Sequence, residues 1–403
     1  MKRLLLLVAA LSVAAGAMSQ DIWLGVEKIN PDNSRCVILG KNSTVVATYE
    51  VNAGQIDIPS LIAGDDGKVY YLLHHFGEPG EDVDYTYVYE HDGNSDRLIY
   101  DCPTQQGIFL NDLFYDGANG DIYACGRYTP AQGGYCGFIT KNDHELYSFD
   151  PDGYNEILYS MTVADGHVFS CGSRAYSEGG GSSTNSYATI WIDDQRLAFY
   201  SVNNSCAYDI VYSDGVLWVC GAMQKYGKWV GAIWLTSIFP EKGSVRDLGL
   251  LMTIELDVDT WCYHMYEDAG YLHIAYENNS IESVVMKIRM DNCYVTQGEP
   301  FPAIHLNDGN LVVNNHGFYV ATGSESEYVK NGQIVTTPIQ GEIRKIAVTN
   351  PRNAVIYDLP FTENFEYGTS QPRRECRMRR LLVLRSRQNS PRNTRRSDRK
   401  GLC

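Results

Sequence analysis

Short runs in which apolar and polar residues alternate follow one another along most of the chain, separated by Asp-Gly or Gly-rich breaks. Runs of this kind that are rich in Val, Ile, Tyr and Trp predict antiparallel strands. The stretch DGVLWVCG, Asp214 to Gly221, has close copies elsewhere, with turn glycines at Gly67, Gly120, Gly166, Gly215, Gly270 and Gly317. The repeat length is therefore about 50 residues, a period typical of solenoids and propellers.

Each repeat divides into four strands, as DIVYSDG, VLWVCGA, VGAIWLTS and RDLGLLM do between Asp209 and Met252. The Asp-Gly dipeptides predict hairpin turns, because Gly takes the positive φ that such turns require. The equivalent third strands begin at Tyr85, Tyr135, Tyr187, Ser283 and, as GEIRKIAV in the last repeat, Gly341. Four strands in each repeat predict the blades of a β-propeller.

The N-terminal strands, which begin at Asp21, Arg35 and Thr44, form a blade that lacks its first strand. Circular closure predicts such a blade, because a late strand can complete it and remove two free edges. We expect AVIYDLP, Ala354 to Pro360, to be that strand. The result is an all-β propeller of seven four-stranded blades over residues 20–360; six blades, an open ring, a β-sandwich and a β-helix are the alternatives.

The two ends of the chain differ from the repeats. Residues 1–19 contain Lys2 and Arg3, an apolar run and small residues, which predicts a cleaved signal peptide and export to the cell surface or medium. No other stretch is apolar enough to predict a transmembrane segment. Residues 371–403 carry 12 basic and 2 acidic side chains. They predict a disordered basic tail, which we interpret as sequence read in a shifted frame, with a native basic tail as the alternative.

The body between these ends is strongly acidic. Residues 20–370 contain 19 basic and 47 acidic side chains, whereas the net charge of the whole chain is −16. A field of this sign keeps an exported protein soluble. It disfavours nucleic acid and anionic membranes as partners.

The chain contains 11 cysteines, and three of them share one position in successive repeats. Cys125, Cys171 and Cys220 stand where the later repeats have alanine, which predicts a small buried packing site and free thiols. If one disulfide forms, Cys125 with Cys136 is the best pair, on neighbouring strands.

Two segments resemble known bacterial families. YDGANGDIYACGRYTPAQGGYCGFITKN, from Tyr115, resembles bacterial seven-bladed propeller repeats with a D..GN.Y..G pattern, which implies the fold and no particular activity. LPFTENFEYG, Leu359 to Gly368, resembles the opening of the cleaved-adhesin or choice-of-anchor J type modules of exported Bacteroidota proteins. This second resemblance implies that residues 361–370 begin an adhesion module whose remainder is lost.

Motifs that carry known chemistry are missing from the sequence, including the P-loop, GxSxG, HExxH and CxxC. FDPDGYNE, Phe149 to Glu156, offers Asp150, Asp152 and Asn155 to a calcium ion, but a turn between blades explains the same residues. We therefore expect no cofactor, with calcium as the alternative.

One position near the start of each first strand is polar in most repeats. Aligning the repeats on their turn glycines places there Ser60, Asp112, Met161, Asp209, His264 and Asn310. The innermost strands surround the channel of a propeller, and ligands bind in such concave sites. Asp112, Asp209 and His264 are therefore candidate ligand-binding residues, with solvated rim residues as the alternative.

Basic residues follow the second strands of three consecutive repeats. Arg127, Arg174 and Lys225 stand in these predicted loops and are flanked by Tyr128, Tyr176, Tyr226 and Trp229. In an acidic body they would make one sector locally positive. Such a sector suits a glycan or peptide that carries carboxylates, because aromatic faces stack and guanidinium groups pair with carboxylates.

We therefore expect an exported or cell-surface propeller that binds a glycan or peptide, in the manner of an adhesin, with no catalytic apparatus. The alternatives are a propeller-fold glycan hydrolase or lyase that uses Asp112, Asp209 and His264, and a spacer domain of a larger surface protein. An enzyme requires two of these groups about 5 to 10 Å apart in a deep pocket. A binding protein would instead have a shallow aromatic face, and a spacer would have no pocket.

Overall fold

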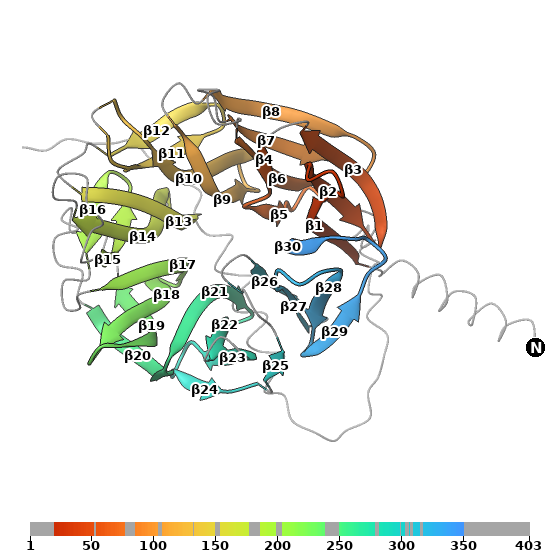
Figure 1. Ribbon diagram of the computed structural model, residues 1–403. Coiled ribbons are helices and arrows are strands. Elements are labelled where there is room, and N and C mark those ends of the chain that lie inside the picture. Colours follow the sequence, from red (N-terminus) through yellow and green to blue (C-terminus); the bar gives the residue numbers. More distant parts are fainter. Residues whose placement is uncertain are drawn as a thin grey trace, which may run out of the picture. The chain divides into compact units, whose positions relative to one another are not determined.

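Seven sheets surround a central axis in the computed structural model, and the fold is an all-β propeller (Figure 1). The structure describes residues 20–51, 54–76, 85–103, 107–131, 133–149, 154–176, 186–198, 204–237, 250–278, 282–298, 300–302, 306, 309–314 and 317–349. In these ranges, no helix is long and apolar enough to cross a bilayer.

The blades follow one another in chain order, and each runs outward from the axis. Blade 1 contains β1 (Asp21–Ile29), β2 (Arg35–Lys41) and β3 (Thr44–Val51). Blade 2 contains a divided inner strand, β4 (Gln55–Asp57) and β5 (Leu61–Ala63), then β6 (Val69–Phe76), β7 (Tyr85–His91) and β8 (Asp96–Pro103). Blade 3 contains β9 (Phe109–Asp116), β10 (Asp121–Tyr128), β11 (Cys136–Lys141) and β12 (His144–Ser148).

The remaining blades repeat this arrangement. Blade 4 contains β13 (Tyr154–Ala164), β14 (His167–Tyr176), β15 (Ser186–Ile192) and β16 (Gln195–Ala198). Blade 5 contains β17 (Ser205–Ser213), β18 (Val216–Lys225), β19 (Lys228–Ser237) and β20 (Leu250–Val258). Blade 6 contains β21 (Thr260–Asp268), β22 (Tyr271–Asn278), β23 (Glu282–Arg289), β24 (Tyr294–Thr296) and the short β25 (Phe301–Pro302). Blade 7 contains β26 (Asn310–Asn314), β27 (Gly317–Ala321), β28 (Glu327–Lys330) and β29 (Gln333–Thr336).

The Asp-Gly dipeptides form the tight turns that the sequence predicts. Between β17 and β18, Asp214 and Gly215 have φ of 50° and 81°. Two positive φ values in a two-residue loop are the requirement of a type I′ turn, which follows the twist of the paired strands. The turn sequence therefore sets the register of the first hairpin in this blade.

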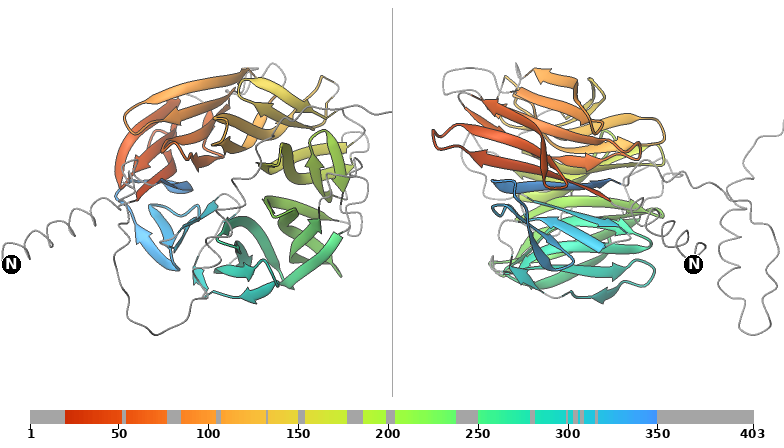
Figure 2. Two further views of the ribbon diagram at one scale, coloured as in Figure 1. Left: turned by 180° about the vertical axis from the view of Figure 1, so that it is seen from behind. Right: turned by 90° about the vertical axis from the view of Figure 1, so that its right-hand side faces the viewer.

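The ring closes through β30 (Glu342–Thr349), which pairs with β1 as the innermost strand of blade 1. From behind, blue β30 lies beside the red N-terminal strands (Figure 2). At the end of this pairing, Trp23 Nε1 donates a buried hydrogen bond of 3.0 Å to Thr349 Oγ1. Closure joins segments from the two ends of the propeller and leaves neither as a free edge.

Two sequence predictions about this closure need correction. GEIRKIAV, from Gly341, was expected to be the third strand of the last repeat, but β28 has that place and GEIRKIAV forms β30. β30 also fills the place that we expected Ala354 to Pro360 to take, and those residues lie outside the described part. A strand with alternating apolar residues could be the third strand of the last blade or the strand that closes blade 1. Only its pairing with β1 distinguishes the two positions.

The apolar core lies between neighbouring blades. In one cluster, Cys125 and Ile139 of blade 3 pack with Leu158, Met161 and Trp191 of blade 4. The nine cysteines of the described ranges are free, and eight of them are buried, as predicted for packing sites. The proposed pair Cys125 and Cys136 is not bonded, because Cys136 lies opposite Tyr128 while Cys125 lies opposite Ile139.

Candidate functional site

The inner strands of blades 3 to 6 each carry one extra residue, a β-bulge. The four bulge residues are Asn111, Tyr159, Tyr208 and Tyr263. In blade 5, a Cβ added to Gly221 would lie 1.9 Å from the carbonyl oxygen of Cys206, so this close approach requires glycine. Gly126 and Gly172 stand at the same place in blades 3 and 4, whereas blade 6 forms its bulge opposite Tyr276.

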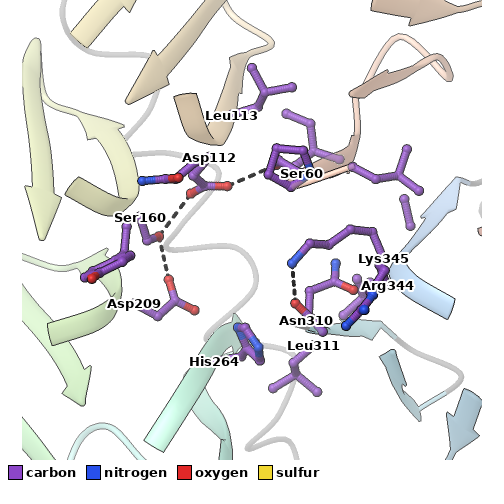
Figure 3. Close-up of a pocket in the computed structure, with 18 of the residues that line it drawn as sticks. Ser60, Asp112, Leu113, Ser160, Asp209, His264, Asn310, Leu311, Arg344 and Lys345 are labelled. Carbon is purple, nitrogen blue, oxygen red and sulfur yellow. Dashed lines mark hydrogen bonds between the residues drawn. The ribbon is translucent and has the colours of Figure 1, made fainter. Parts of the chain in front are cut away.

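The residue that follows the bulge also faces the channel. Together with its equivalents in the other blades it forms a set that we call the channel ring: Ser60, Asp112, Ser160, Asp209, His264, Asn310 and Lys345. The next residue in each strand is buried between blades, for example Leu113 at 3% and Ile210 at 3% exposure. The polar positions therefore share one lumen, as Figure 3 shows.

The sequence alignment placed Met161 at the blade 4 position, and this is wrong by one residue. Met161 is 4% exposed and packs between blades, whereas Ser160 lines the channel opposite Cys171. Ser160 stands six residues before its turn glycine Gly166, as Asp209 does before Gly215 and His264 before Gly270, so the alignment of this repeat was one residue short. A slip of one residue transfers a side chain to the other face of a strand.

Lys345 is the ring residue that sequence reasoning missed. It stands on β30 directly after the bulge residue Arg344, opposite Gly25 of β1. Its Nζ donates a hydrogen bond of 2.6 Å to the carbonyl oxygen of Gly309. The sequence feature that could have identified Lys345 is the polar pair Arg344-Lys345 inside GEIRKIAV. It becomes informative once that segment is recognised as an inner strand.

The channel encloses a cavity of about 970 Å³ that is lined in three layers. The first layer contains the bulge residues, and the second is the channel ring. A third layer is mainly apolar and includes Ile62, Phe114, Val211, Val312 and Ala347. A cavity of this size is large enough for a small-molecule ligand.

Asp112, Ser160 and Asp209 form a hydrogen-bonded row across one wall of the channel (Figure 3). The Ser160 hydroxyl lies 3.1 Å from Asp112 Oδ2 and 2.7 Å from Asp209 Oδ1, so these two oxygens are at most about 5.8 Å apart. Ser60 Oγ donates to the other oxygen of Asp112 at 3.1 Å. We call Asp112 and Asp209 the acid pair.

The acid pair also joins neighbouring blades through the backbone. Three channel ring residues each accept the N–H of a residue in the next blade: Asp112 from Met161 at 3.2 Å, Asp209 from Met265 at 2.6 Å, and Asn310 from Ile346 at 2.8 Å. The amide of Asn310 makes this link without a charge. The link between blades therefore does not itself require a carboxylate.

The acid pair retains a proton at higher pH than ordinary carboxyl groups. Burial raises the pKa of Asp209 to about 7, and the Asp112 charge adds to this effect. Burial also raises the pKa of Asp112. The Ser160 hydroxyl has one proton and can donate it to only one of the two carboxylates. A proton on the other carboxyl group lets that group donate to the Ser160 oxygen, so that both contacts are hydrogen bonds.

The opposite wall of the channel is neutral or basic. His264 Nε2 lies 2.6 Å from the carbonyl oxygen of Leu306, which can only accept, so Nε2 carries the proton and Nδ1 is an acceptor. Burial and the nearby Lys345 charge lower the pKa of His264 to about 3, which keeps the imidazole neutral. Figure 3 shows Lys345 and Arg344 across the lumen from the acid pair.

The three predicted cations lie at strand ends of blades 3, 4 and 5 and are already engaged. Arg174 contacts Glu156, which is 2% exposed, at 3.1 Å, and lies over the ring of Tyr154. Lys225 forms an exposed ion pair with Glu255. Arg127 lies over two aromatic rings, 4.2 Å from the Tyr135 centroid and 5.2 Å from that of Phe109.

These cations are also not at equivalent positions. The three can be compared by their distance from the glycine of the Cys-Gly dipeptide in the same repeat. Arg127 directly follows that glycine, Arg174 is two residues past it, and Lys225 is four residues past it. Successive strand residues point to opposite faces, so Arg127 faces the other side of its blade from the position that Arg174 occupies. The structure thus does not bring the three together, and their binding of a ligand stays a prediction.

The predicted aromatic flank is dispersed as well. Tyr226 is 96% exposed at the turn between β18 and β19, and Trp229 is half-buried just beyond it. Tyr128 packs edge-on against Phe138, and the side chain of Tyr176 lies outside the described part. The described members of the flank and the three cations do not line the channel cavity.

Metal ligands do not gather in the described ranges, which hold no group of three or more His, Cys, Asp or Glu that could bind an ion. The candidate calcium residues Asp150 and Asp152 lie outside those ranges. Asn155 is described, and its Oδ1 accepts the backbone N–H of Tyr135 at 2.9 Å.

Comparisons with known proteins identify the fold. No protein-family description matches the chain, and no curated protein matches it. The periplasmic gluconolactonase PpgL of Pseudomonas aeruginosa is similar in structure, with a TM-score of 0.54, 10% identity and coverage of 82% of this chain and 99% of that chain. A Bacteroides uniformis protein provisionally named a 6-phosphogluconolactonase has a TM-score of 0.48 and 12% identity, and covers 83% of this chain and 100% of its own. At these identities the likeness shows the propeller fold alone.

Proposed function

We propose that the protein is an exported propeller that binds a small glycan or peptide-like ligand in its central channel, against the acid pair and Ser160. One observation carries the proposal: two carboxyl groups share a single hydroxyl within a cavity of about 970 Å³. The signal-like residues 1–19 support export.

The acid pair costs stability that its structural role does not require. Asn310 links blade 7 to blade 1 with an amide, so an amide could do the same in blades 3 and 5. Burying a carboxyl group is unfavourable, and burial raises the pKa of both acids. Buried carboxyl groups with raised pKa values are typical of functional sites, even though their burial lowers the stability of the fold.

One oxygen of Asp209 is placed to receive a ligand. In the described part of the chain, Oδ1 accepts from Ser160 and Ile210, whereas Oδ2 accepts only from the backbone N–H of Met265. A carboxylate oxygen has about two acceptor sites, so Oδ2 retains one. A ligand hydroxyl or N–H in the channel would donate to this atom.

Hydrolysis is the second candidate, because the acid pair has the elements of acid–base catalysis. Asp209, with a pKa of about 7, would protonate a leaving group while Asp112 acts as the carboxylate. Their bridged oxygens are at most about 5.8 Å apart, which is less than the 6.5 to 9.5 Å typical of inverting glycosidases. PpgL is named a gluconolactonase, and that activity belongs to a protein 10% identical to this one.

Calorimetry tests the proposal with three probes, cellobiose, glucuronate and triglycine, at pH 5.5 and 8.5. We expect at least one probe to bind, and its affinity to change between the two pH values because the protonated and ionised acid pair form different hydrogen bonds. Asp209→Asn should remove that pH dependence. Asp259→Asn is the matched control, because Asp259 has φ 58° at an exposed turn and pairs only weakly with Lys228 at 3.4 Å.

Two results would contradict the proposal. One is that none of the probes binds, and the other is that a probe binds wild type and Asp209→Asn with the same affinity at both pH values. Turnover of p-nitrophenyl glycosides separates the two candidate functions. Hydrolysis that is lost in both Asp112→Asn and Asp209→Asn supports the enzyme, whereas binding without turnover supports the binding protein.

A further inference from the structure

Three of the bulge residues are tyrosines from consecutive blades. The ring centroids of Tyr159 and Tyr208 are 5.8 Å apart, and those of Tyr208 and Tyr263 are 4.9 Å apart, in tilted arrangements. All three side chains are half-buried and line the channel cavity. We call them the tyrosine wall.

The hydroxyl groups of two of these tyrosines lie beside buried polar groups. The hydroxyl groups of Tyr159 and Tyr208 lie close enough to the buried thiol of Cys206 to interact with it electrostatically, and that of Tyr159 also interacts with the buried Ser173. Hydroxyl groups beside buried partners leave the aromatic rings of these two side chains as the surface that a ligand could contact.

The wall occupies only one side of the channel mouth. The bulge residue of blade 3 is Asn111, and that of β30 is Arg344, which pairs with Glu27 at 3.1 Å. An apolar seal for the channel would need similar residues in every blade. A one-sided wall, with polar groups facing it, instead matches a ligand that has one apolar face and a polar edge.

We infer that the tyrosine wall stacks against one face of a pyranose ring, so that the ligand of the channel is a cyclic sugar. This inference rests on the proposed function. A pyranose ring has C–H groups on its face and hydroxyl groups around its edge, and aromatic rings pack on such a face. Its hydroxyls would then reach Asp209 Oδ2, His264 Nδ1 and the Lys345 ammonium group as donors and acceptors.

Saturation-transfer NMR on the full chain tests this with methyl β-D-glucopyranoside and the acyclic polyol sorbitol as probes. We expect the pyranoside to bind with strongest transfer to the C–H protons of one ring face, and sorbitol to bind far more weakly. Tyr208→Leu should raise the dissociation constant of the pyranoside about 2- to 12-fold, the range of aromatic stacking effects. Tyr208→Phe keeps the ring and should stay within about twofold of wild type.

Tyr294→Leu is the matched control, because Tyr294 is 68% exposed on the outer strand β24. Equal binding of both probes, or transfer spread evenly over both ring faces, would overturn the stacking inference and leave the proposed function standing. The transfer measurement on wild type decides this even if Tyr208→Leu fails to fold. If the pyranoside does not bind, the cyclic-sugar inference is wrong; if triglycine or glucuronate still binds the channel, the proposed function survives without it.

Discussion

Asp209→Asn should change how the stability of the propeller depends on pH. The pKa of Asp209 is raised from 3.8 to about 7 in the folded protein, because burial disfavours the charged form. A group with a raised folded pKa contributes stability that is complete below its unfolded pKa and is lost as pH rises through its folded pKa. The wild-type protein should therefore lose this contribution between about pH 4 and pH 7.

The size of the effect follows from the pKa values. A difference of about three pH units at 1.36 kcal/mol each corresponds to roughly 4 kcal/mol of unfolding free energy between pH 4 and pH 8. For a propeller of roughly 330 residues the unfolding entropy near the midpoint is about 0.7 kcal/mol/K, so this equals about 6 °C in melting temperature. An asparagine has no proton to lose and should not show this part of the pH dependence.

The assay is thermal unfolding of wild type and Asp209→Asn from pH 4 to pH 8, with Asp259→Asn as control. Carboxylates distant from the channel titrate alike in wild type and Asp209→Asn, so the difference between their melting temperatures reports the acid pair. We expect the melting temperature of Asp209→Asn to rise by about 6 °C relative to wild type across this range. Parallel pH profiles for wild type and Asp209→Asn would show that Asp209 ionises normally and that the acid pair holds no proton near neutral pH.

Three further outcomes are expected. Gly221→Ala should lower stability by about 3 kcal/mol or more, because its Cβ would lie 1.9 Å from the Cys206 carbonyl oxygen, and an unchanged melting temperature would refute this account of the bulge. Thr349→Val should cost about 1 to 3 kcal/mol by leaving Trp23 Nε1 unpaired, and urea unfolding that matches wild type would contradict it. The buried thiols should react with a thiol reagent only on unfolding, and a disulfide found by mass spectrometry among the nine described cysteines would contradict their assignment as packing groups.

The blade pattern could be predicted from sequence because its determinants are local. Alternation of apolar residues defines strands, and the Asp-Gly turn at Asp214 requires positive φ at both central residues. Closure could not be predicted in this way. β30 has the same alternation as any strand of a blade, and its partner β1 stands more than 300 residues earlier in the chain.

The candidate site was only partly predictable for a related reason. Asp112, Asp209 and His264 were expected at the channel, and the structure brings them together there, although their role in binding stays a prediction. The surface cations were chosen by composition, and composition carries no information on partners such as the Glu156 carboxylate beside Arg174. Pairing of this kind is decided by register between strands.

The bulge accounts for the character of the site. In a regular strand, Tyr208 and Asp209 would point to opposite faces, one into the lumen and one between blades. The extra residue lets both line the cavity, so a stacking surface and an acid come from adjacent positions. The same local device joins Tyr263 to His264 in the next blade. An aromatic residue followed by a polar one, opposite a Cys-Gly or Ala-Tyr dipeptide on the next strand, is therefore the sequence pattern that predicts residues lining this channel. Strict alternation of faces would assign one residue of each such pair to the wrong face.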